Sequence, residues 1–227
     1  MPTIPTLADL TDEYNRRYSS MKLLRGREAR DAARRLSNSR SRYEAVSHET
    51  GVPWEVIAAL HNRESGGDFR GVLHNGEHII GTGRKTKLVP SGRGPFKTWE
   101  EAAIDALRIK RLHQVRVWDI PRILYTFESF NGWGYRWYRG IASPYLWSGT
   151  DQYKAGKYVA DGKWDARAVD QQLGAVPVYF YLKQLQGAAT PESKAEPAPV
   201  PEPGPQPEKP SLAAIIISIL AKMFGKS

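Results

Sequence analysis

Most of the first 187 residues carry apolar positions at helical spacing. Trp54, Ile57, Ala58 and Leu60 share one face of a helix, because residues three and four apart lie on the same side. Glycines at 66 and 67 end that helix. The chain is therefore predicted to be mainly α. Further helices are predicted over residues 7–21, 99–114, 120–130 and 166–185, the last one disturbed at Pro177. Residues 26–49 are also predicted to be helical, though not uniformly.

Between two of these helices the pattern is lost. Residues 70–97 are rich in glycine and have no apolar period, which predicts a small loop lobe with a short hairpin over His74–Ile80. Helical spacing returns after Thr98, whose hydroxyl is expected to form a capping box with Glu101. The expected fold is a helical domain carrying one irregular lobe.

The chain divides into three zones. Residues 1–187 are predicted to form one folded domain, whose first 50 residues are helical and basic. Residues 211–227 contain an apolar stretch and are predicted to form a short C-terminal helix. The intervening residues 188–210 form a linker that is expected to be disordered and extended. Its prolines are Pro191, Pro197, Pro199, Pro201, Pro203, Pro205, Pro207 and Pro210.

The apolar tail is too short for a membrane span. As a helix, Leu212–Phe224 would cover about 20 Å, whereas a bilayer core needs about 30 Å. Lys222 and Lys226 lie near its end. We therefore expect the tail to insert shallowly into an anionic membrane; docking on the domain or self-association is the alternative.

The charge and composition of the chain limit which binding partners are expected. The net charge is +9, with 33 Lys and Arg against 24 Asp and Glu, which favours anionic surfaces. No nucleic-acid-binding signature accompanies this charge, so no specific nucleic acid is expected. The chain has no cysteine and therefore no disulfide or thiolate metal site. Its first ten residues lack the pattern of a secretory signal peptide.

Glu64 is a candidate general acid because of its position in the sequence. Glu64 ends the apolar helix and precedes two glycines. The negative end of the helix dipole and partial burial both disfavour its ionised form, so its pKa should rise. A glycosidase needs such a protonated carboxyl to donate to the leaving oxygen. A surface glutamate at a helix end is the simpler interpretation of this segment alone.

A second segment adds to this pattern. Phe130-Asn131-Gly132 ends another helix, and together with Glu64-Ser65 it resembles the goose-type lysozyme and lytic transglycosylase superfamily, with Phe in place of the family's Tyr. The chain more closely resembles phage-type lysozyme-like endolysins over about residues 40–185. The resemblance is carried by Gly51–Trp54, Arg63–Ser65, Leu73–Gly76, Thr98–Glu101, Ser143–Gly149 and Lys157–Gly162.

The resemblance implies an enzyme that cleaves peptidoglycan strands between amino sugars, with Glu64 as general acid. No metal or cofactor is expected, because His74, Glu77 and His78 lie in a glycine-rich loop and do not make a convincing ligand set. We expect action on the cell wall after synthesis in the cytoplasm and holin-like release. Lytic transglycosylation, and a non-catalytic basic protein binding cell wall or nucleic acid, remain open. Candidate second carboxylates are Glu101, Glu77 and Asp68. Candidate substrate-binding residues are Ser65, His74, Asn75, Phe130, Asn131, Gly132, Tyr135, Tyr145 and Trp147.

Overall fold

A computed structural model describes residues 3–160 and 162–189. This part of the chain is mainly helical, as predicted, and the expected tail and nearly all of the expected linker lie outside it. The elements are α1 (Leu7–Ser20), α2 (Gly26–Ser37), α3 (Arg40–Thr50), α4 (Trp54–Ser65), α5 (Trp99–Ile109), the 3₁₀ turn η1 (Leu112–Gln114), α6 (Ile120–Asn131), α7 (Gly134–Arg139), α8 (Pro144–Trp147), β1 (Lys157–Ala160), β2 (Lys163–Asp165) and α9 (Ala175–Ala189).

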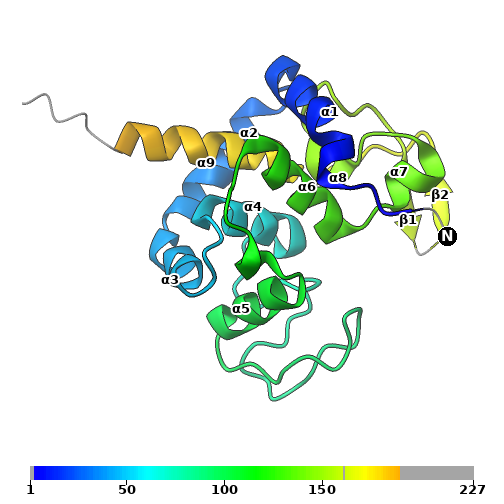
Figure 1. Ribbon diagram of the computed structural model, residues 1–227. Helices are drawn as coiled ribbons and strands as arrows, with labels where there is room; N and C mark the ends of the chain where they lie inside the picture. The colour runs from blue at the N-terminus through cyan, green and yellow to red at the C-terminus, as the bar shows by residue number, and fades with distance from the viewer. Residues whose placement is uncertain (1–2, 161, 190–227) are drawn as a thin grey trace, which may run out of the picture. The chain divides into compact units, whose positions relative to one another are not determined.

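Helix α4 runs through the middle of the described residues and packs against α2, α3 and α9 (Figure 1). Every residue from Trp54 to Asn62 is buried. A helix buried on all sides must be held by neighbours on all sides, and its end is therefore fixed in position. That end carries Glu64.

Two further helix pairs complete the core. Helix α1 packs on α6, and α3 packs on α5 (Figure 1). Aromatic side chains fill the spaces between them, and such side chains contribute large buried apolar areas. The largest fully buried side chains include Tyr14, Tyr43, Trp99, Phe127 and Trp147.

The helix predicted over residues 26–49 is two helices. The break falls at Asn38 and Ser39, between α2 and α3. Helix α2 packs on α9, whereas α3 packs on α4 and α5. One straight helix would not reach both sets of neighbours, so tertiary packing overrides the local helical preference.

The last helix begins at Ala175, so the predicted start at residue 166 is wrong. Gly174 lies against α8, where an added Cβ would be 2.2 Å from the carbonyl oxygen of Leu146. Its N–H donates to the carbonyl of Ser148 at 2.8 Å. This close contact holds the preceding segment against α8. Pro177 falls in the first turn of α9, where its missing N–H costs no hydrogen bond.

The hairpin also differs from the prediction. Within residues 74–80 the chain makes only one isolated bridge, between His78 and Gly71. The two-stranded sheet of the described residues is the antiparallel pair of β1 and β2. Among the described residues, no helix combines the length and apolar character needed to cross a membrane.

Candidate active site

Glu64 lies in the last turn of α4. The helix stops because Gly66 adopts the left-handed conformation, with φ +66°, and its N–H donates to the Asn62 carbonyl at 3.0 Å. Glycine adopts this conformation without the steric cost that a Cβ brings. Glu64 is thus placed among helix-end carbonyls, where a negative charge is disfavoured.

Tyr145 is the direct partner of Glu64. Its hydroxyl donates a hydrogen bond of 2.6 Å to Oε1 of Glu64. Tyr145 lies on the short helix α8, which Ser143 caps by accepting from the Tyr145 N–H at 3.3 Å. Burial, together with the neighbouring Glu64, raises the pKa of Tyr145 well above its ordinary value. Tyr145 therefore remains a protonated donor.

The surroundings of Glu64 allow its carboxyl group to stay protonated up to about neutral pH. Burial raises the pKa of Glu64 to about 7, although the Tyr145 hydrogen bond and the charges of Arg63 and Lys110 act in the opposite direction. A carboxyl with this pKa is protonated in a large fraction of molecules at pH 7. It can donate a proton and later accept one.

Lys110 is a site residue that the sequence did not reveal. It caps the C-terminus of α5, and its Nζ donates to the carbonyls of Ser129 and Phe130 at 3.3 and 3.4 Å. Its ammonium lies 5.3 Å from the centre of the Phe130 ring. Burial lowers the pKa of Lys110, while Glu64 raises it. Lys110 thus links the end of α6 to the site, and no local pattern signals this role.

Arg63 ties the site to the segment before α9. Its Nη2 pairs with Asp170, whose side chain is 1% exposed. Its Nη1 donates to the carbonyls of Gln172 and Leu173 at 3.1 and 3.3 Å. The guanidinium also lies 5.1 Å from the centre of the Tyr145 ring. Arg63 therefore fixes Tyr145 and the 170–173 segment relative to the end of α4.

His74 was expected to bind substrate, and the structure shows it packed inside the loop lobe. Its side chain is 1% exposed and its Nε2 lies 2.8 Å from Asp105 Oδ2. The ring stacks on Phe96, with centroids 5.5 Å apart. Asp105 also pairs with Arg93. These contacts anchor the loop on α5, and the same loop brings Gly76 against the Glu64 carbonyl.

Two of the candidate second carboxylates have other partners. Asp68 pairs with Arg70, at 2.6 Å from Nη2. Glu101 forms the predicted capping box with Thr98, which accepts from the Glu101 N–H at 3.2 Å. In the described residues, the charged groups that shift the pKa of Glu64 are both cations, and no carboxylate is among them.

The third, Glu77, holds the loop lobe together. Its Oε2 accepts hydrogen bonds from the N–H groups of Lys87 and Leu88, both at 3.0 Å. Asn75, a candidate substrate residue, donates to the same oxygen at 3.0 Å and accepts from the Glu77 N–H at 3.1 Å. Both side chains are engaged in the turn that carries Gly76.

The remaining candidates are spread over several environments. Ser65 donates to the carbonyl of Asp68 at 3.1 Å. Trp147 is 2% exposed and Phe130 is 9% exposed, so both belong to the core. Tyr145 alone among the candidates has a hydrogen bond to the Glu64 carboxyl within the described residues.

Three candidates lie on and just after α6. Asn131 ends that helix and is exposed, and Gly132 follows with φ +92°. Tyr135 faces the hairpin, where its ring lies 5.4 Å from Tyr158 and 6.1 Å from Trp164. Tyr135, on α7, thus forms an aromatic group with Tyr158 and Trp164 of the hairpin.

The chain matches no protein-family model, no curated protein and no solved structure. The described residues form a mainly helical protein with a half-buried carboxylic acid at a helix end, hydrogen-bonded to a buried tyrosine.

Proposed function

We propose that this protein cleaves the glycan strands of bacterial peptidoglycan, with Glu64 as the general acid. The observation that carries the proposal is the Glu64 carboxyl itself. Its pKa is raised to about 7 by burial, and the Tyr145 hydroxyl orients it through one hydrogen bond of 2.6 Å. A positioned acid with such a pKa is what protonation of a glycosidic oxygen requires.

In the proposed reaction, Glu64 donates its proton to the glycosidic oxygen as the C1–O bond breaks. The carboxylate that forms is stabilised by Tyr145 and by the charges of Arg63 and Lys110. The same carboxylate then accepts a proton from the hydroxyl that attacks C1. This attacking hydroxyl belongs either to water or to the sugar itself.

Attack by the sugar hydroxyl, which is lytic transglycosylation, is favoured by one observation. The candidate second carboxylates Asp68, Glu77 and Glu101 are each engaged with other partners. Hydrolysis by two carboxylates places the second one within about 5–10 Å of the first. One residue that acts first as the acid and then as the base is sufficient when the substrate itself supplies the nucleophile.

The test is a lysis assay on outer-membrane-stripped bacteria and on purified peptidoglycan. Glu64→Gln should fold normally and lose activity by about a hundredfold or more. Glu49→Gln, an exposed glutamate at the end of α3, is the matched control and should keep full activity. Mass spectrometry of the fragments separates anhydro ends from reducing ends. Lysis by Glu64→Gln at the wild-type rate would refute the proposal.

A further inference from the structure

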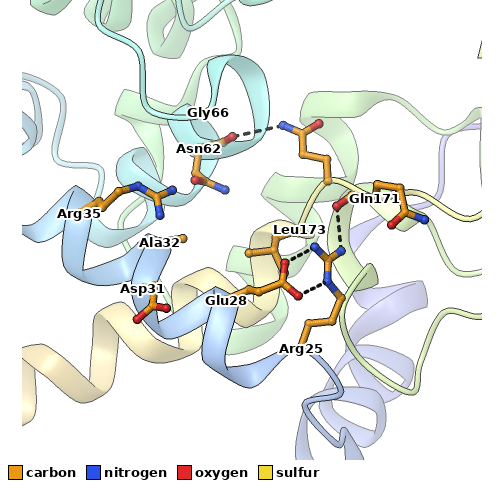
Figure 2. A pocket seen from close by; sticks show the side chains of 10 residues that line it. Arg25, Glu28, Asp31, Ala32, Arg35, Asn62, Gly66, Gln171 and Leu173 are labelled. Carbon is orange, nitrogen blue, oxygen red and sulfur yellow. Dashed lines mark hydrogen bonds and ion pairs between the residues drawn. The ribbon is translucent and has the colours of Figure 1, made fainter.

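A pocket lies on the other side of the α4 end from Glu64. It has a volume of about 380 Å³ and is formed by α2, the end of α4 and residues 171–173 (Figure 2). Asn62 lines it, and Asn62 is two residues from Glu64 on the same helix. Side chains two residues apart on a helix point to different sides. The pocket is therefore separate from the candidate active site, and its size suits a short peptide or a small molecule.

The Asn62 side chain is the polar group at the top of this pocket. The residue is 5% exposed, yet no described group forms a hydrogen bond with its side-chain amide. The one bond drawn to Asn62 in Figure 2 comes from Gln172 and reaches the backbone carbonyl, at 3.2 Å. The amide is open to the pocket, since it is not one of the buried side-chain atoms that lack a partner in the described residues. A ligand amide bond would pair with it, because an asparagine both donates and accepts.

Two opposite charges face the same pocket without partners. Arg35 and Asp31 lie one helical turn apart on α2, both are exposed, and neither forms an ion pair within the described residues (Figure 2). The other charged pair in the lining is already neutralised, since Arg25 binds Glu28 and the Gln171 carbonyl. Arg35 can therefore bind a carboxylate of a ligand, and Asp31 can bind an amino group of the same ligand.

The end of α4 is exposed beside the pocket. Gly66 lines the pocket, and an added Cβ there would meet nothing within 4 Å. Leu173 and Ala32 supply apolar surface in the same lining.

We propose that this pocket binds the peptide stem that branches from the peptidoglycan strand. The stem carries carboxylates, amide bonds and a free amino group, which match Arg35, Asn62 and Asp31 respectively. This inference rests on the proposed function for the choice of peptide. It makes the enzyme selective for strands that still bear their peptides.

The experiment measures binding of a synthetic stem tetrapeptide, with a diamino acid at its third position, to the full-length protein by calorimetry. We expect saturable one-to-one binding that Arg35→Gln weakens about tenfold or more. Arg34→Gln is the matched control, because Arg34 is the adjacent exposed arginine and lines a different pocket. Its affinity should stay within about twofold of wild type.

A second arm tests the amino group. Asp31→Asn should weaken binding of the free peptide and leave binding of the same peptide with its side-chain amine acetylated unchanged. The side-chain amide resonance of Asn62 should shift on titration. Absence of saturable binding, or an equal loss in Arg34→Gln, overturns the proposal.

The two proposals fail separately. If the protein binds the tetrapeptide in an Arg35-dependent way but cleaves no glycan, the pocket stands and the proposed function falls. If it cleaves glycan and does not bind the tetrapeptide, only the pocket assignment is overturned.

Discussion

Gly76 lies so close to Glu64 that a Cβ added to it would be 2.3 Å from the Glu64 carbonyl oxygen. Gly76 also has φ +77°, a conformation that favours glycine. The loop lobe therefore rests directly on the helix turn that carries the candidate acid. Replacing this glycine should move the lobe away from Glu64.

Gly76→Ala tests that contact, with Gly81→Ala as its control. Gly81 has φ +71° but open space around it, so its substitution costs backbone strain alone, roughly 1–2 kcal/mol. Gly76→Ala adds a backbone clash and should destabilise the protein more and reduce lysis about tenfold or more. Chemical denaturation and lysis rates measure both effects. Equal behaviour of the two variants would contradict the contact.

Tyr145→Phe should raise the pKa of Glu64. The hydroxyl hydrogen bond favours the carboxylate, so its loss leaves burial less opposed. A general acid works while protonated, and the fall of activity on the alkaline side should therefore move to higher pH. The pH profile of lysis and NMR titration of the Glu64 carboxyl both report the shift. An unchanged or lower pKa in the variant would argue against this role for Tyr145.

Glu64→Gln should stabilise the protein at neutral pH. The pKa of Glu64 rises from 4.5 to about 7 on folding, so between these values the folded state holds a proton that the unfolded state has released. Wild-type stability consequently falls as pH rises through this window. The variant lacks this penalty and should gain about 3 kcal/mol, or roughly 6–12 °C in Tm, at pH 8.

The same comparison at pH 4 provides the control. Glu64 is then mostly protonated in both states, and the two proteins should unfold at nearly the same temperature. A gain in Tm that is equal at pH 4 and pH 8 would mean that titration of Glu64 is not its cause.

Asp170→Asn should be strongly destabilising. Asp170 is buried and pairs with both Arg63 and Lys157, so its neutralisation leaves Arg63 uncompensated, at a cost of about 3 kcal/mol. Glu44→Gln breaks an ion pair with Arg40 in which both side chains are exposed and should cost less than about 1 kcal/mol. Urea denaturation measures the loss in the free energy of unfolding for the two variants. A similar small loss in both would show that the Asp170 pair does not hold the site.

Deletion of residues 211–227 tests the tail that the sequence predicts. Activity on purified peptidoglycan should be unchanged, because the candidate site lies wholly within residues 3–189. Binding to anionic liposomes and lysis of intact cells should fall, since the tail is apolar and flanked by lysines. Liposome cosedimentation measures the first effect. Equal liposome binding by both proteins would remove the membrane role.

The sequence by itself determined the features that depend on neighbours along the chain. Helical spacing placed α4 and the glycines that end it, and the capping box of Thr98 and Glu101 marked the start of α5. The same local reasoning singled out Glu64, because a helix end and partial burial both act on its pKa. In these segments the local conformational preferences are strong enough to be recognised from the sequence alone.

Tertiary structure decided which residues meet Glu64. Tyr145 is 81 positions away in the chain and forms its hydrogen bond only because α8 packs beside the end of α4. Lys110 was not predicted at all, and the start of α9 was misplaced because Gly174 is held against α8. Contacts between distant segments depend on how whole helices pack, and no spacing pattern encodes them.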